Sequence, residues 1–106
     1  MKRRISALAK VVRSKNSGPF ELTFDVIFGS QPRYDKAKKM NLINQRLICS
    51  TYSLAEKSIL NIIYFDPARA VKVTVARPVP SGSMGDTDVY GSQQHMPLAN
   101  AEVEWD

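Results

Sequence analysis

The residues best suited to binding or catalysis are concentrated between positions 81 and 95. Two carboxylates, a phenol, two amides and the single histidine occur there within ten residues, which include Asp86, Asp88, Tyr90, Gln93, Gln94 and His95. Neighbouring glycines such as Gly85 and Gly91 let the backbone approach a ligand closely. Loops held by a rigid scaffold often carry binding groups. We therefore predict a polar ligand-binding loop; the alternative is a surface loop whose polar groups only satisfy turns.

Within this loop the candidate catalytic residues are Asp86, Asp88, Tyr90 and His95, and the candidate ligand-binding residues are Gln93 and Gln94. Free histidine titrates near neutral pH, so His95 could act as a general base. The sequence identifies neither a nucleophile nor an orienting carboxylate for it, so a structural role is the alternative. Asp86 and Asp88 have the spacing that begins a calcium loop, but the rest of that ligand pattern is missing. We expect no metal site and no bound cofactor.

A second candidate site lies near the N-terminus, where Lys10, Arg13 and Lys15 precede a predicted turn at Ser17-Gly18-Pro19. Such cations hold a phosphate or a carboxylate through charge-assisted hydrogen bonds. We assign Lys15 and Asn16 to ligand binding on this basis. The segment lacks the Gly-Lys-Ser/Thr ending of a Walker loop, and the chain lacks the dinucleotide-binding fingerprint. A solvated surface is the alternative interpretation.

The charge distribution bears on possible partners. The pI of about 9.6 suggests nucleic acid, but Phe20, Phe24 and Phe28 fall on the predicted core face of one strand and leave no surface on which bases could stack. All 15 Lys and Arg residues lie within residues 1–77, whereas five of the ten Asp and Glu residues lie within residues 78–106. We therefore disfavour nucleic acid. The charge asymmetry predicts that the acidic tail lies across a basic face or meets a basic partner; the alternative is a solvated surface with a chance imbalance of charge.

Length and composition indicate one globular domain over residues 1–106. The 106 residues are 43% hydrophobic and 24% charged, as in ordinary folded domains. Cys49 is the only cysteine and cannot form an internal disulfide, so we expect a cytoplasmic protein. Lys10 and Arg13 interrupt the N-terminal apolar residues, and no apolar run approaches the roughly 20 residues that span a bilayer. We expect neither a signal peptide nor a membrane segment.

Periodicity predicts both helices and strands. The clearest strand is Phe20–Phe28, in which apolar and polar residues alternate. Helices are predicted over residues 5–12 (with a strand as the alternative), from near Pro32 with Ser30 as the cap, and over Leu42–Tyr52, with a further helical turn after Ser53. Further strands are predicted over Ile59–Phe65, Ala70–Arg77 and Ala101–Trp105. Residues 77–100 are predicted to form an extended Gly/Pro/Ser-rich tail.

This order of elements suits an α+β sandwich, with an antiparallel sheet and helices on one face. Ile59–Phe65 is too apolar for an open edge, so we place it centrally, beside Phe20–Phe28. Ala101–Trp105 would then supply an edge that pairs with a second copy or with another protein. We expect a homo- or hetero-oligomer in which Trp105 is partly buried at that contact.

Three stretches together resemble a known family; they are Lys10–Phe20, Tyr64–Thr74 and Arg77–His95. The chain is similar to small proteins of unassigned function related to the C-terminal domain of acyclic terpene utilisation protein A (AtuA). The resemblance covers nearly the whole chain. It implies a ferredoxin-like fold.

The resemblance also implies a function, because such proteins accompany, or are fused to, a large AtuA-like domain. On this basis we expect a small subunit of a two-component enzyme that is not catalytic alone. The enzyme would be of hydratase or lyase type on acyl-CoA or small-acid substrates, and the loop over residues 77–100 would contribute to a site shared with the AtuA-like large subunit. The alternative is a stand-alone binding module for an anionic ligand or nucleic acid.

Overall fold

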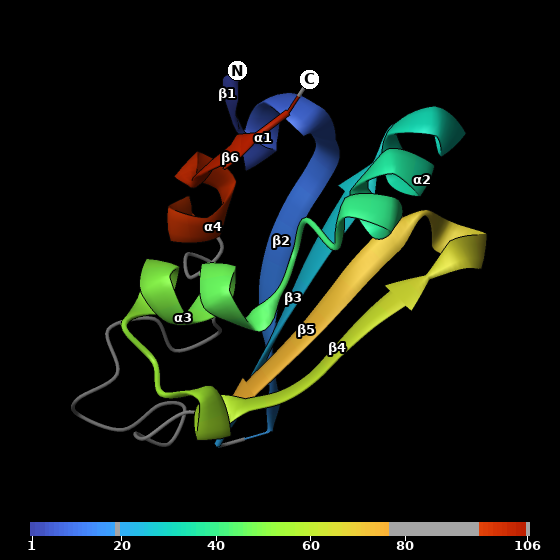
Figure 1. Cartoon of the computed structure of the whole chain (residues 1–106). Coiled ribbons are helices and arrows are strands. Elements are labelled where there is room, and N and C mark those ends of the chain that lie inside the picture. The colour runs from blue at the N-terminus through green and yellow to red at the C-terminus, as the bar shows by residue number, and fades with distance from the viewer. Residues whose placement is uncertain (19, 77–95, 106) are drawn as a thin grey trace.

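The computed structural model describes residues 1–18, 20–76 and 96–105 (Figure 1). In chain order the strands and helices are β1 (Lys2–Arg4), α1 (Ile5–Leu8), β2 (Ala9–Gly18), β3 (Glu21–Phe28), α2 (Gln31–Met40), α3 (Gln45–Tyr52), β4 (Ile59–Phe65), β5 (Ala70–Ala76), α4 (Met96–Asn100) and β6 (Glu102–Glu104). Two short 3-10 helices flank β4, namely η1 (Glu56–Ser58) and η2 (Asp66–Ala68). The predicted α+β class is confirmed.

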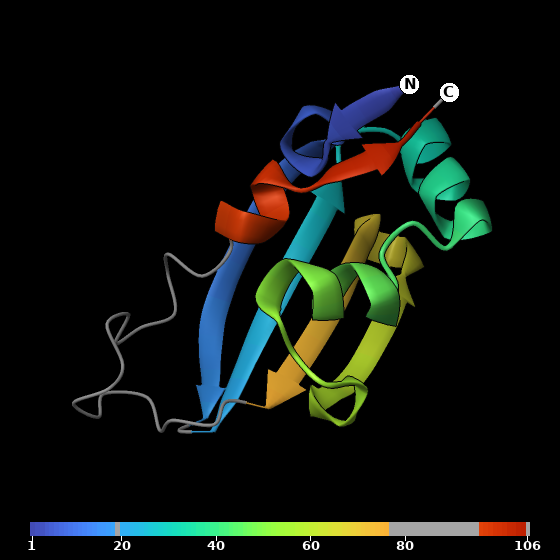
Figure 2. The same ribbon diagram turned by 60° about the vertical axis from the view of Figure 1, so that its left-hand side comes forward.

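The main sheet has four strands in the order β2-β3-β5-β4, and all neighbours are antiparallel. The chain makes a hairpin of β2 and β3 and a second hairpin of β4 and β5. Since β3 and β4 both run antiparallel to β5, they run parallel to each other, and α2 and α3 connect them. In both ribbon views α2, α3 and α4 lie over one face of the sheet (Figures 1 and 2). No described helix lies over the opposite face.

The core lies between the sheet and these helices. Its buried side chains alternate along the two central strands and continue onto the helices; they include Leu22, Phe24, Val26, Phe28, Val71, Val73, Val75, Tyr34, Ala37 and Ile48. The strand predicted for residues 20–28 is thus confirmed over Glu21–Phe28. Phe20 was placed on the core face incorrectly, because it precedes the strand and is 55% exposed.

The N-terminal segment differs from the predicted helix. Only Ile5–Leu8 form a helical turn, and the chain then becomes strand β2 over ten residues. Ile5 and Leu8 are buried, as a helical spacing requires, but Val11 and Val12 point to opposite faces of the sheet. Pairing with β3 along the hairpin outweighs the helical spacing, because each residue of the strand gains cross-strand contacts that a short isolated helix lacks.

The two longer helices begin at polar caps. Ser30 accepts a hydrogen bond from the Arg33 N–H (3.4 Å) and caps α2, as predicted. Asn44 caps α3 by accepting from the Leu47 N–H (2.9 Å), so this helix begins three residues later than expected. Ser53 ends α3 in the left-handed conformation. The helical turn predicted after it is present as η1, but its N-cap is Ala55 and not Ser53. None of the described helices is both long and apolar enough to cross a bilayer.

The position of β4 corrects the predicted strand order. The hairpin of β4 and β5 is present, with Arg69 in the left-handed conformation after η2. However, β4 lies at an edge of the sheet, and the central strands are β3 and β5. Its apolar residues divide between two environments: Ile62 and Tyr64 pack against the core, while Ile63 is 44% and Phe65 43% exposed.

The end of the chain forms a second, two-stranded sheet with its beginning. The strand predicted at 101–105 is present as β6, but it pairs with β1 and not with the main sheet. Residues 96–100, expected to be extended, form α4, and Leu98 is buried in the core. Trp105 is half-buried within this chain, and the Lys36 ammonium lies 4.4 Å from its ring centre.

Candidate functional site

Most of the predicted site residues lie outside the residues that the structure describes; these are Asp86, Asp88, Tyr90, Gln93, Gln94 and His95. Lys15 and Asn16 lie in β2, where they pair with Thr23 and Leu22 of β3. Because consecutive residues of a strand point to opposite faces, Lys15 projects from the helix-free face and Asn16 from the helix-covered face. Only Lys15 therefore belongs to the surface considered next.

The helix-free face of the main sheet is the most distinctive surface of the described chain. We call it the open face. Its side chains come from alternate positions of the four strands; they are Val11, Arg13, Lys15, Thr23, Asp25, Ile27, Ala70, Lys72, Thr74, Asn61, Ile63 and Phe65. Their alternation with the buried residues follows from the strand period of two. The face combines cations with exposed apolar side chains.

Asp25 occupies the middle of the open face and is only 6% exposed. The strand register places it directly between Arg13 of β2 and Lys72 of β5. The Arg13 Nε donates to Asp25 Oδ2 at 3.1 Å. The Lys72 Nζ lies 4.0 Å from Oδ1, which is too long for a hydrogen bond, and Oδ1 has no hydrogen-bond partner among the described residues.

A buried carboxylate is costly for the fold when one of its oxygens accepts no hydrogen bond from the described residues. Buried polar atoms are nearly always hydrogen-bonded, and replacing a buried ion pair by apolar side chains is often neutral or stabilising. Arg13 and Lys72 remain largely solvated, with side chains 63% and 45% exposed. The stability of the fold alone therefore gives little reason for an aspartate at position 25. It lies between two cations, hydrogen-bonded to Arg13 and within ion-pair distance of Lys72.

Apolar side chains surround this charged centre. Val11 is 36%, Ile63 44% and Phe65 43% exposed. The Lys72 ammonium lies 5.5 Å from the Phe65 ring centre, within the range of a cation–π contact. Among the residues of the open face, Phe65 is the one aromatic, and it lies on edge strand β4. The face therefore suits a partner surface with both apolar and acidic groups better than it suits stacked bases.

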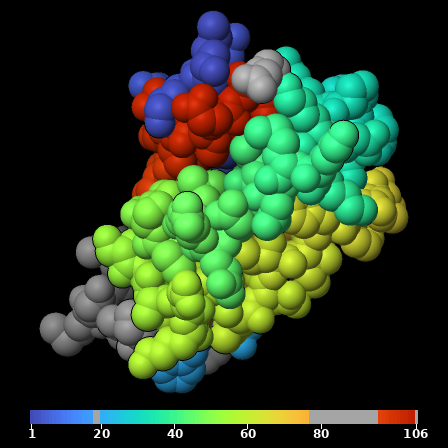
Figure 3. Space-filling view, in the orientation of Figure 1, coloured from blue at the N-terminus to red at the C-terminus, as the bar shows by residue number. Residues whose placement is uncertain are grey.

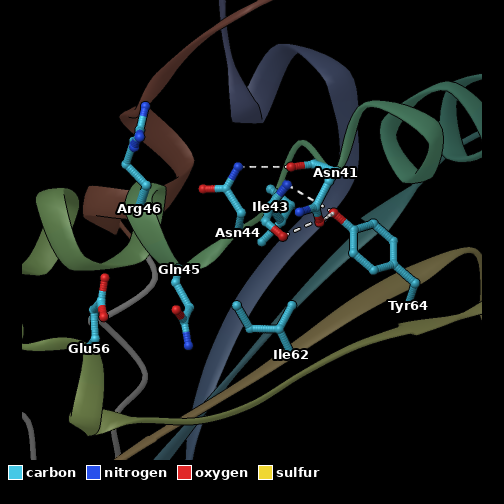
Figure 4. Close-up of a pocket in the computed structure, with 8 residues that line it drawn as sticks. All are labelled: Asn41, Ile43, Asn44, Gln45, Arg46, Glu56, Ile62 and Tyr64. Carbon is cyan, nitrogen blue, oxygen red and sulfur yellow. Dashed lines mark hydrogen bonds between the residues drawn. The ribbon is translucent and has the colours of Figure 1, made fainter.

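A separate polar pocket of about 670 Å³ opens between α3 and β4 (Figure 4). Its lining residues are Asn41, Ile43, Asn44, Gln45, Arg46, Glu56, Ile62 and Tyr64. The Tyr64 hydroxyl accepts from the Ile43 N–H (3.1 Å) and lies within donor distance of the Ile43 carbonyl oxygen (3.0 Å) and Asn41 Oδ1 (3.2 Å). Burial raises the pKa of Tyr64, so the phenol stays protonated at neutral pH. These bonds fix the loop between α2 and α3, and we assign the pocket a structural role.

A third polar cluster connects α2 to the turn between β4 and β5. The Tyr34 hydroxyl donates to Asp66 Oδ1 at 2.5 Å, and the Lys38 Nζ donates to the same atom at 2.9 Å. The hydrogen bond from Tyr34, followed by that from Lys38, lowers the pKa of Asp66 below its ordinary value of 3.8. Burial of Tyr34 and its bond to this carboxylate raise the pKa of the phenol.

This cluster predicts a pH dependence of stability. A carboxyl whose pKa is lower in the folded chain contributes stability above its ordinary pKa and loses that contribution as the pH falls through the lowered value. We expect Asp66→Asn to lower Tm by a few degrees at pH 7 and to reduce the further loss of Tm between about pH 4 and pH 2. Thermal unfolding followed by circular dichroism would measure this. Asp35→Asn, on the same helix as Tyr34 and Lys38, is the control and should keep the wild-type acid loss. Equal behaviour of the two variants would contradict the assignment.

Comparison with known proteins gives one match. A family described as "Domain of unknown function (DUF4387)" matches residues 5–102. The chain belongs to this family. No curated protein and no solved structure matches the chain. The DUF4387 match contains every strand of the main sheet, so the open face and Asp25 lie within the family domain.

The open face of this DUF4387 domain was missed in the sequence, although two signals were present. Asp25 is the one charged residue within Leu22–Phe28, and Lys72 alternates with the valines of its segment. The alternation along its strand places Asp25 on the polar side, opposite the core residues. Its burial follows from the register, which brings Arg13 and Lys72 to either side of it, and the register depends on which strands are neighbours.

Proposed function

We propose that this DUF4387 domain is an accessory subunit that binds a larger protein through its open face. The observation that carries the proposal is Asp25, a buried carboxylate between Arg13 and Lys72 in the middle of a sheet face that no described helix covers. A binding surface gains affinity when its charged groups are held in place before the partner arrives. Asp25 does this for both cations.

The apolar part of the open face supports the same proposal. Exposed apolar patches with polar surroundings mark protein-binding sites in soluble proteins. Val11, Ile63 and Phe65 are exposed apolar side chains of this kind, and they lie on the strands at either side of the charged centre. Arginine and aromatic side chains are among the residues that contribute most to protein interfaces, and the open face supplies Arg13 and Phe65.

The charge of the open face specifies the chemistry of the partner. Arg13, Lys15 and Lys72 provide three positive charges against the single negative charge of Asp25. Complementary charges speed encounter and exclude wrong partners. The contact surface of the partner therefore carries acidic side chains next to apolar ones.

The family resemblance supplies a candidate for this larger protein, an AtuA-like large subunit. In that complex the DUF4387 domain would form part of a two-component enzyme of hydratase or lyase type on acyl-CoA or small-acid substrates, with the polar loop that contains Asp86 and His95 at the shared site. A ferredoxin-like fold is part of the same proposal. It is supported by the parallel pair β3 and β4, joined through helices, with β5 between them, which is the split β-α-β arrangement.

Val11→Glu tests the proposed binding surface. A negative charge at this position of the open face would oppose an acidic partner, so we expect binding to the AtuA-like large subunit to weaken at least about tenfold, or by about 1.4 kcal/mol. Co-purification and isothermal titration would measure the change. Met40→Glu is the matched control, because Met40 is similarly exposed (42%, against 36% for Val11) but lies at the end of α2. Equal affinity of the two variants, or full enzyme activity of the large subunit without this chain, would contradict the proposal.

The same cations would also suit a phosphate-bearing ligand, and salt dependence separates the two functions. Binding to nucleic acid falls steeply with salt, with a log–log slope set by the number of phosphates neutralised. Docking of a partly apolar protein surface depends on salt much less. A single-stranded oligonucleotide that binds at 50 mM salt and is released at 200 mM would favour the anionic-ligand module over the accessory subunit.

A further inference from the structure

The two edges of the main sheet are unlike each other. An edge strand presents unpaired backbone groups, and proteins usually protect such an edge with charged side chains or a bulge. Edge strand β2 has both, since it carries Lys10, Arg13 and Lys15 and contains an irregularity between Ala9 and Val11. The opposite edge, β4, has an irregularity between Ile59 and Asn61 but no charged side chain.

Edge strand β4 has no charged residue in its seven positions, Ile59–Phe65. Leu60 is 50% exposed, and Ile63 and Phe65 are exposed to a similar extent. Within the described chain, β4 pairs only with β5. The space-filling view shows this region (yellow) at the surface beside α2 and α3, which leave it uncovered (Figure 3). An apolar edge of this length is ready to pair with another strand.

We propose that β4 pairs antiparallel with β4 of a second copy of this chain, so that two four-stranded sheets join into one of eight strands. Because β4 carries no charged side chain, we expect its partner to be the β4 strand of a second copy of the chain. Like charges directly opposite each other destabilise an antiparallel pair, and two β4 strands bring none together. Two β2 strands, in contrast, would bring lysine and arginine side chains together. An acidic partner strand would gain nothing from uncharged β4.

Side-chain orientation specifies the register. Asn61, Ile63 and Phe65 belong to the open face, whereas Ile62 and Tyr64 point to the helix-covered side. A two-fold axis at Ile63 places Ile63 of one copy opposite Ile63 of the other, Phe65 opposite Asn61, and Tyr64 opposite Ile62. Both members of each pair then point to the same side of the joined sheet, as the strand period of two requires. The apolar residues of both open faces then adjoin across the axis. The pocket beside Tyr64 comes to lie next to the same residues of the other copy.

Distance decides between edge pairing and face-to-face stacking of two copies. In edge pairing the two Lys72 side chains are three strand spacings apart, about 14 Å, which exceeds the screening length of about 8 Å at physiological salt. Face-to-face sheets lie about 10 Å apart with interdigitated side chains. Stacked open faces would therefore press Arg13, Lys15 and Lys72 of one copy against the same cations of the other. Edge pairing also leaves the charged centre of each open face uncovered.

A cysteine placed on the axis tests the register. In a Cys49→Ser background, Ile63→Cys puts two thiols opposite each other, with Cα atoms about 4.5–5.5 Å apart, within the range of a disulfide. We expect mild oxidation to convert the chain to a disulfide-linked dimer on a non-reducing gel. Val11→Cys, an exposed position on β2, is the matched control and should remain monomeric on that gel. Equal cross-linking at both positions, or none at Ile63, would overturn the proposal.

Mass in solution tests the interface without a cross-link. Light scattering during gel filtration should give twice the chain mass for the wild type at high micromolar concentration and for Val11→Lys. Ile63→Lys should give the chain mass with an unchanged circular dichroism spectrum, because the new lysines oppose each other on the axis. A monomeric wild type, or a dimer that survives Ile63→Lys, would exclude β4 pairing.

Discussion

Replacing Phe24 by alanine is expected to lower the free energy of unfolding by about 3–5 kcal/mol. Phe24 is fully buried in central strand β3, and its ring centre lies 4.9 Å from that of Tyr52 in α3. The substitution removes this contact between the sheet and the helix layer and leaves a cavity in the core. Since a domain of this size has a total stability of roughly 5–15 kcal/mol, the change would remove a large share of it.

Urea unfolding followed by circular dichroism would measure this loss, which corresponds to a fall in Tm of roughly 10–25 °C. Phe20→Ala is the matched control, because it deletes the same side chain from a residue that is 55% exposed and precedes the strand. We expect the control to change stability by less than about 1 kcal/mol. Equal losses for both variants would show that Phe20 belongs to the core after all.

Asp25→Val, at the next residue of β3, is expected to have the opposite effect on stability and a large effect on binding. The free energy of unfolding should be unchanged or higher by up to about 2 kcal/mol, because a β-branched apolar side chain replaces a buried carboxylate with an unbonded oxygen. Binding to the large subunit should weaken about tenfold, because Arg13 and Lys72 lose the group that holds them in place.

Thr74→Val is the control for this variant, since it makes a nearly isosteric change from polar to apolar on the open face without altering charge. It should leave both stability and binding close to the wild-type values. Urea unfolding and isothermal titration on the same preparations separate the two effects. A loss of more than about 1 kcal/mol of stability in Asp25→Val would show that the carboxylate serves the fold, and unchanged binding would show that it does not serve the partner.

Local sequence chemistry was sufficient for several elements. The alternation along residues 21–28 predicted a strand and its buried side, because the two faces of a strand follow directly from its period of two. Ser30 predicted the start of α2, because a capping hydroxyl acts on a backbone N–H within the same turn. The hairpin of β4 and β5 and the strand near the C-terminus were predicted on similarly local grounds. Each depends only on residues close together in the chain.

Residues 9–12 show where local reasoning failed. Their spacing is compatible with the helix predicted over residues 5–12, but pairing with β3 makes them part of strand β2. The edge position of β4 is a second case. An apolar run indicates burial, but the helices cover only one side of β4, so half of its apolar residues remain exposed. Both outcomes depend on which segments become neighbours, which no single segment specifies.

The sequence by itself determined the α+β class, the strands β3, β4 and β5, the cap of α2 and the large positive charge of the N-terminal part. The tertiary structure decided what those charges do. By setting the order β2-β3-β5-β4, it placed Asp25 between Arg13 and Lys72 and left β4 as an uncharged edge. The physical reason is that side-chain periodicity assigns each residue to a face of its own strand, whereas the neighbours across that face come from segments up to about fifty residues away, brought together only when the core forms.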